Sequence, residues 1–162
     1  MAPILSFTAE EVWQHLPKHE GKTDSVYLAD FPIVKEQWIN EALSHRMEVF
    51  QKLRNEVLKS LEKSRQTKEI GNSLEAKAIL SANGEVAQIM VHYKNELADL
   101  LQVSQVEIDE IKNESVPEIS VKIMHAEGKK CERCWRWNTE VGQFEKHPTL
   151  CGRCHEALES LV

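Results

Sequence analysis

The four cysteines of this chain form two Cys-x-x-Cys pairs, and this spacing constrains the fold more than any other feature of the 162 residues. The pairs are separated by the 16 residues from 135 to 150. Two residues between paired cysteines let a tight turn direct both sulfurs at one point, and this gap is typical of zinc ribbons and knuckles. The pattern predicts one structural Zn²⁺ bound by Cys131, Cys134, Cys151 and Cys154.

A site with four sulfur ligands has no open position at which a water molecule could be activated, so we expect a structural metal and no catalytic residue in it. A segment of about 30 residues is too short to fold on an apolar core alone, and the metal should supply most of its folding free energy. An iron–sulfur cluster stays open as an alternative, and so does replacement of one cysteine by His147 or His155. A redox pair is disfavoured because a second pair is present.

The composition is that of a soluble globular protein, with 28% charged and 41% hydrophobic residues and a net charge of −6. No apolar run approaches the roughly 18 to 20 residues that span a bilayer, and the N-terminus lacks the features of a signal peptide. We therefore expect a cytoplasmic protein with no membrane partner. No Gly-rich phosphate loop, G-x-S-x-G or H-E-x-x-H motif indicates catalysis elsewhere in the chain.

Basic and aromatic residues gather beside the first cysteine pair, although the chain as a whole is acidic. Residues 129–155 hold six basic and three acidic side chains, whereas residues 95–120 hold seven acidic side chains and one lysine. Guanidinium groups next to indoles are suited to stacking on unpaired bases and pairing with phosphate. Packing inside the small module is the other interpretation, and strand-like alternation would place both tryptophans on one face. The candidate RNA contacts here are Arg133, Trp135, Arg136 and Trp137.

The first 70 residues have a helical pattern. Thr8 as N-cap, with Glu11 completing a capping box, predicts a helix over 9–16, and 26–31 reads as an extended segment. Residues 34–68 contain no Gly or Pro and predict one long amphipathic helix. The apolar stripe of this helix comprises Ile39, Leu43, Phe50, Leu53, Val57 and Leu61. Arg46 and Arg54 lie in or beside the stripe and are further RNA candidates, or they pair with acids at the surface.

Residues 71–126 alternate between strand and helix patterns. Period-two alternation over 74–80 ends at Asn83-Gly84, helical spacing follows over 85–101, and extended segments follow at 103–108 and 119–123, with a loop at 113–117. We expect a strand-helix-strand-strand unit that buries one sheet face against a helix. The fold class is α+β, with a helical part (1–70), a small mixed α/β unit (71–126) and a zinc ribbon or knuckle (127–162).

Three stretches resemble a known family. PILSFTAEEVWQHLP (3–17) closely resembles a segment of the anticodon-binding helical domain of class I isoleucyl-tRNA synthetases. RNEVLKSLEKSRQTKEIGNSLEAKAIL (54–80) resembles the long helix of that family and the junction that follows it, and CERCW…CGRC resembles the C-terminal zinc module of the bacterial type. The stretches occur in the order of the family and cover nearly the whole chain.

The resemblance implies a C-terminal fragment, since the family's catalytic domain with its HIGH and KMSKS signatures and its editing domain have no counterpart here. The whole enzyme would attach isoleucine to its tRNA with ATP, whereas this part would bind the anticodon stem-loop. Arg133 and Trp135 are then the foremost RNA contacts. The implied partners are isoleucine tRNA and the missing catalytic part, with a monomeric chain. A zinc-stabilised docking module that touches no RNA is the alternative, favoured by the acidic block at 95–120.

Overall fold

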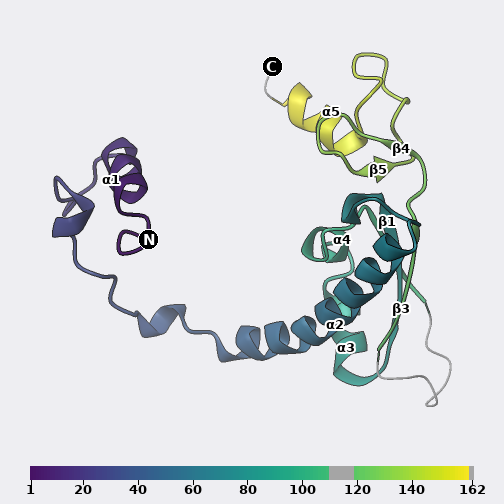
Figure 1. Ribbon diagram of the computed structural model, residues 1–162, viewed down its shortest axis with the longest axis horizontal. Helices are drawn as coiled ribbons and strands as arrows, with labels where there is room; N and C mark the ends of the chain where they lie inside the picture. The colour runs from purple at the N-terminus through teal and green to yellow at the C-terminus, as the bar shows by residue number, and fades with distance from the viewer. Residues whose placement is uncertain (110–118, 161–162) are drawn as a thin grey trace. The chain divides into compact units, whose positions relative to one another are not determined.

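The computed structural model describes residues 1–109 and 119–160, and they form two compact units, Met1–Asn40 and Glu41–Val162 (Figure 1). The loop expected at 113–117 lies outside the described residues. Helices and small sheets are mixed along the chain, and the four cysteines cluster near its C-terminal end. The predicted α+β class with a terminal zinc ribbon is therefore confirmed.

The first unit is organised around the carboxylate of Glu10. It contains α1 (Ser6–His15) and the 3-10 turns η1 (Val26–Leu28) and η2 (Glu36–Trp38). The hydroxyl of Ser25 and the amide of Val26 donate to Glu10 Oε2 at 2.8 and 3.0 Å. These bonds fold the segment after the helix back onto it, because one ionised carboxylate can accept several donors.

Two predictions for this unit are wrong. The helix begins at Ser6, and its N-cap is Leu5, with no capping side chain, so Thr8 lies inside the helix instead of before it. Residues 26–28 form a turn of 3-10 helix and not an extended segment, because the Ser25 hydroxyl also accepts from the amide of Tyr27.

The long helix α2 (Glu41–Gln66) buries the C-terminal part of its predicted stripe. Phe50, Leu53, Val57 and Leu61 are buried as expected. The predicted start at residue 34 is wrong, and Ile39 is 59% and Leu43 41% exposed. Both residues come before Val49, the first residue of α2 that belongs to the hydrophobic core. Helical periodicity alone does not reveal how much of an apolar stripe the rest of the protein covers.

A three-stranded sheet follows α2. After η3 (Ser73–Glu75), the elements are β1 (Ala76–Ala82), α3 (Gly84–His92), α4 (Leu97–Leu100), β2 (Gln105–Ile108) and β3 (Ile119–His125). The strand order is β2-β1-β3, with β1 and β2 parallel and β1 and β3 antiparallel. The strand-helix-strand-strand prediction is thus confirmed, although the helix expected over 85–101 is divided by a turn.

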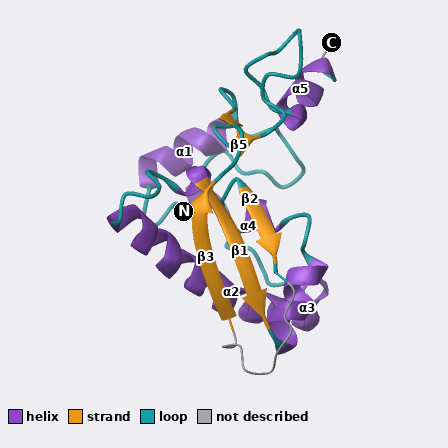
Figure 2. Ribbon diagram, turned by 90° about the vertical axis from the view of Figure 1, so that its right-hand side faces the viewer, coloured by secondary structure: helices purple, strands orange, loops and turns teal. Residues whose placement is uncertain are grey.

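One hydrophobic cluster joins α2, α3 and one face of the sheet (Figure 2). Every second residue of β1 is buried, and three of these four are alanines: Ala76, Ala78 and Ala82. Side chains this small leave space over the centre of the sheet, and larger residues of α2 such as Leu53, which is 0% exposed, fill it, while the backbone of α2 lies nearest to β3. The core therefore depends on α2 as much as on the strand unit.

The C-terminal module continues directly from β3. It consists of the short antiparallel pair β4 (Lys129–Lys130) and β5 (Trp137–Asn138) and the helix α5 (Gly152–Glu159). Gly128 precedes β4 with φ +92°, and a Cβ there would overlap the carbonyl of Asn138. Only glycine fits both this backbone conformation and this close approach.

Candidate metal centre and nucleic-acid surface

The four cysteine side chains converge on one point in the C-terminal module. Their sulfur atoms all lie within 4.8 Å of one another, and Cys134 Sγ is 3.7 Å from Cys151 Sγ. A regular tetrahedron with Zn–S bonds of about 2.3 Å has a sulfur–sulfur edge of about 3.8 Å. Cys131, Cys151 and Cys154 are buried and Cys134 is half-buried. The donor set and its spacing fit a structural zinc ion that is closed to substrate.

The first cysteine turn is fixed by its own backbone. The amide of Trp135 donates to the carbonyl of Cys131 at 2.8 Å, and the amide of Cys131 donates to the carbonyl of Arg136 at 2.8 Å. Trp135 has φ +65°, a left-handed conformation that is uncommon for an aromatic residue. This residue reverses the chain immediately after the second cysteine of the pair, so the chain returns as β5 beside β4.

The second cysteine turn opens helix α5, and Glu140 binds its first amide. Gly152 donates its backbone N–H to Glu140 Oε2 at 3.1 Å, while Asn138 Oδ1 accepts from the Glu140 amide at 2.7 Å. A carboxylate at a helix N-terminus satisfies an unpaired amide and interacts favourably with the helix dipole. A Cβ on Gly152 would lie 2.5 Å from Glu140 Oε2, so a larger residue at this position would require the Glu140 side chain to move.

The environments of the Cys131 and Cys151 thiols differ. Burial opposes ionisation of Cys131, but backbone amides, those of Cys134 and Cys151 first, lower its pKa to about 6. Burial and the neighbouring Cys154 and Cys134 side chains raise the pKa of Cys151 to about 12. Without a cation, Cys131 and Cys151 therefore do not ionise together, and binding of a divalent metal displaces the thiol protons of its ligands.

The two tryptophans beside the first cysteine pair have different surroundings. Trp135 is 62% exposed, and Lys130 Nζ lies over its ring, 5.5 Å from the centroid. Trp137 is half-buried, with its ring edge-on to His125 at 4.5 Å and its amide donating to Ser104 Oγ at 2.8 Å. The prediction that both lie on one face is wrong, because the left-handed backbone at Trp135 breaks the alternation of a strand.

The arginines of the module also divide into two kinds. Arg133 is exposed, and its Nη1 lies 3.6 Å from Cys154 Sγ, a contact that stabilises a thiolate ligand. Arg136 is half-buried and pairs with Asp99 at 2.5 Å, and Arg153 lies 3.5 Å from the same carboxylate. Asp99 thus ties the module to α4.

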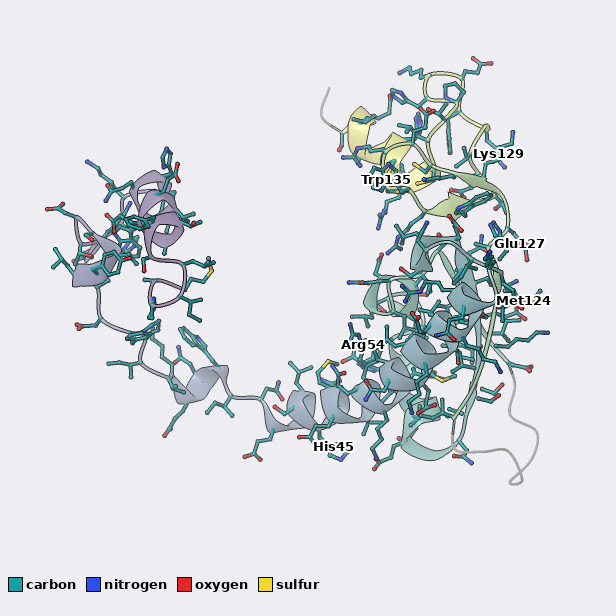
Figure 3. All side chains as sticks on the ribbon, viewed as in Figure 1. His45, Arg54, Met124, Glu127, Lys129 and Trp135 are labelled. Atoms are coloured by element: carbon teal, nitrogen blue, oxygen red, sulfur yellow. The ribbon has the colours of Figure 1, made fainter. Side chains whose placement is uncertain are left out.

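The two arginines of α2 that are RNA candidates, Arg46 and Arg54, are both half-buried. Arg46 Nη1 lies 3.1 Å from His92 Nε2, and its buried Nε has no hydrogen-bond partner among the described residues. Arg54 makes no ion pair within 1–109 and 119–160. Figure 3 shows Arg54 and Trp135 on the same side of the second unit, away from Met124 and Lys129.

Sequence reasoning missed the residues that join the module to the sheet and that open α5: Asp99, Ser104, His125 and Glu140. The acidic block containing Asp99 was visible in the sequence, but nothing local indicates that one of its carboxylates pairs with arginines more than 30 residues away. Among the described residues, no helix combines the length and the apolar character needed to span a bilayer.

Comparison with known proteins gives two family matches. Residues 1–80 match the "Anticodon-binding domain of tRNA ligase", and residues 128–156 match the "Zinc finger found in FPG and IleRS". The second match contains all four cysteines and Trp135.

Similar full-length proteins extend over almost the whole chain. An isoleucine–tRNA ligase of Syntrophotalea carbinolica is 41% identical over 160 residues, which are 95% of this chain and 17% of that protein. The ligase of Geobacter sulfurreducens is 38% identical over 98% of this chain and 18% of its own length. One from Staphylococcus epidermidis is 41% identical over 100% of this chain and 18% of its own length. The chain thus spans less than a fifth of these relatives.

Proposed function

The chain belongs to the isoleucine–tRNA ligase family, and we propose that it binds the anticodon stem-loop of an isoleucine tRNA as part of a longer ligase. The longer protein would attach isoleucine to that tRNA with ATP in the cytoplasm, and the chain would act as a monomer. Within it we assign 1–70 to the helical anticodon-binding part, 71–126 to the α/β unit and 127–162 to the zinc module.

The exposed indole of Trp135 is the single observation that carries the proposal. An aromatic ring that is 62% exposed gains little from the protein core, and a left-handed backbone at an aromatic residue costs about 1 kcal/mol or more. The first cysteine turn, residues 131–136, nevertheless holds the Trp135 ring at the surface, with Lys130 over it. A fixed indole beside a cation stacks on an unpaired base while the cation approaches phosphate.

The zinc ion supplies rigidity, and Cys131, Cys134, Cys151 and Cys154 hold it. The small module has few other buried side chains, because its hydrophobic cluster consists of three of these cysteines with Val141 and Leu150. The metal would therefore fix the first cysteine turn, from which Trp135 and Arg133 project. With four sulfur ligands the metal itself would have no open position for water or for catalysis.

Arg133 and Arg54 are the arginines best placed for phosphate contacts. Arg133 is exposed beside Trp135, and Arg54 lies on the same side of the second unit without an ion pair among the described residues (Figure 3). Arg46 is a further candidate, since its Nη1 lies 3.1 Å from His92 Nε2 and it forms no ion pair with an acidic side chain among the described residues. Arg136 pairs with Asp99 and Trp137 packs on His125, and we assign these two residues a positioning role.

The acidic block at 95–120 is compatible with RNA binding. It was the observation that favoured a docking module without RNA, but Asp99 is neutralised by Arg136 and Arg153 of the module itself. Part of the acidic charge therefore serves the attachment of the module to the core and does not face a ligand.

The experiment measures binding of the zinc-loaded chain to an isoleucine tRNA anticodon stem-loop by fluorescence anisotropy at two salt concentrations. Trp135→Ala should weaken binding by about 1 to 3 kcal/mol if one base stacks on the ring. Arg133→Ala should weaken it less and should also reduce its salt dependence.

Met124→Ala is the control, because Met124 is an exposed apolar residue of β3 on the side of the second unit away from Trp135 and Arg54 (Figure 3). This variant should bind like the unaltered chain. Unchanged affinity of a folded, zinc-loaded double variant, Trp135→Ala with Arg133→Ala, rejects the RNA surface and leaves the docking alternative.

A further inference from the structure

We propose that His147, His155 and Glu159 form a second, weaker site for a divalent transition metal in the C-terminal module, separate from the four cysteines. One ligand atom from each of the three side chains lies within 4.8 Å of the others. Two imidazoles and a carboxylate are a ligand set for Zn²⁺, Co²⁺, Ni²⁺ or Cu²⁺. The inference does not depend on RNA binding.

The distances are close to those of a metal site. His147 Nε2 lies 3.8 Å from Glu159 Oε1. Ligands held at about 2.0 to 2.2 Å from a tetrahedral ion lie about 3.4 Å apart. Both histidines are half-buried and Glu159 is exposed, and the folded chain already places the three ligand atoms within 4.8 Å of one another.

The local structure orients two of the ligands in advance. His155 and Glu159 are four residues apart on α5, which places them on one face of the helix. The ring of Phe144 stacks on that of His155, with centroids 4.4 Å apart and an interplanar angle of 17°. This contact fixes the imidazole plane without using a nitrogen, and the buried Nδ1 of His155 has no hydrogen-bond partner among the described residues.

Lys146 is the group with which a metal would compete. Its Nζ lies 2.9 and 3.2 Å from the two carboxylate oxygens of Glu159. The lysine is 72% exposed, and exposed ion pairs of this kind contribute at most about 1 kcal/mol. A divalent ion with three ligands can therefore displace the ammonium group. It would then link the last turn of α5 to the loop before Pro148.

The experiment determines zinc and cobalt binding to the full 162-residue chain. Equilibrium dialysis against buffered free Zn²⁺, followed by elemental analysis, should show one tightly bound ion and a second at higher free metal. With Co²⁺, the first equivalent should give intense thiolate-to-metal charge-transfer absorption. The second should add only weak ligand-field bands, because its ligands are nitrogen and oxygen.

Substitutions of the ligands and of the competing lysine give opposite expectations. His147→Ala and Glu159→Gln should each weaken the second equivalent by at least about tenfold, the lower bound already found for outer-shell partners of metal ligands. Lys146→Gln should strengthen it. His45→Ala is the control for stray binding to an exposed histidine and should change neither equivalent.

The charge-transfer band of the first cobalt equivalent reports in every variant that the cysteine module is folded. The proposal is overturned if the unaltered chain binds one ion over the whole range of free metal. It is also overturned if the second equivalent persists in both ligand variants or brings further thiolate charge transfer.

Discussion

Ser104 joins the C-terminal module to the sheet by hydrogen bonds. Ser104→Ala should remove these bonds and lower the free energy of unfolding of the chain. Ser104 Oγ donates to the carbonyl of Leu74 at 2.5 Å and accepts from the amide of Trp137 at 2.8 Å. The side chain is half-buried, so water replaces these partners only in part. Each lost hydrogen bond of this kind costs about 0.5 to 1.5 kcal/mol, which gives about 2 kcal/mol for the pair.

Urea unfolding followed by residue-resolved amide exchange measures this loss. With an m value of about 2 kcal/mol per molar urea, the midpoint should fall by about 1 M. The amide of Trp137 should also exchange faster, because it loses its acceptor. Ser120→Ala is the control, since Ser120 is an exposed residue of β3, and it should change stability by less than about 0.5 kcal/mol. Equal midpoints and equal Trp137 exchange in Ser104→Ala and the unaltered chain would refute the reasoning.

Two further predictions concern the metal and the first unit. A chelator that removes zinc should unfold residues 127–160 and leave the α2–sheet core folded, because the two hydrophobic clusters share no residue; retained dispersed amide signals from the metal-free module would contradict this. Hydrogen bonds from the side chains of Gln14 and Ser25 lower the pKa of Glu10 below its usual 4.5, so the bonded carboxylate stabilises the first unit above pH 4.5, and that contribution is lost as the pH falls through the lowered pKa. The indole N–H signal of Trp13, which donates to the carbonyl of Thr23 at 2.8 Å, should report this transition. The transition should be absent in Glu10→Gln, and its persistence there would assign it to another group.

Features with a local cause could be predicted from the sequence. Alternation over 74–80 with Asn83-Gly84 behind it located β1, because burial of one sheet face imposes a period of two. The paired cysteines located the metal centre, since each pair needs only one tight turn to converge. The buried part of α2 followed from helical spacing in the same way.

Features that depend on remote partners could not be predicted. The capping box at Thr8 failed because the Glu10 carboxylate and Ser25 determine the geometry of the first unit across 15 positions of sequence. The difference between Trp135 and Trp137 depends on a left-handed residue and on Ser104 and His125, which belong to the sheet unit. No pattern near the tryptophans contains that information.

The central position of β1 has a consequence for synthesis of the chain. Its parallel neighbour ends at Ile108, and its antiparallel neighbour begins at Ile119, so a chain growing from its N-terminus completes α2 and β1 well before β3 exists. Until then one edge of β1 presents unpaired backbone groups, which are a template for pairing with other chains. The three alanines of β1 make this exposed strand less hydrophobic than one built from larger apolar residues, which reduces the risk of aggregation on the ribosome.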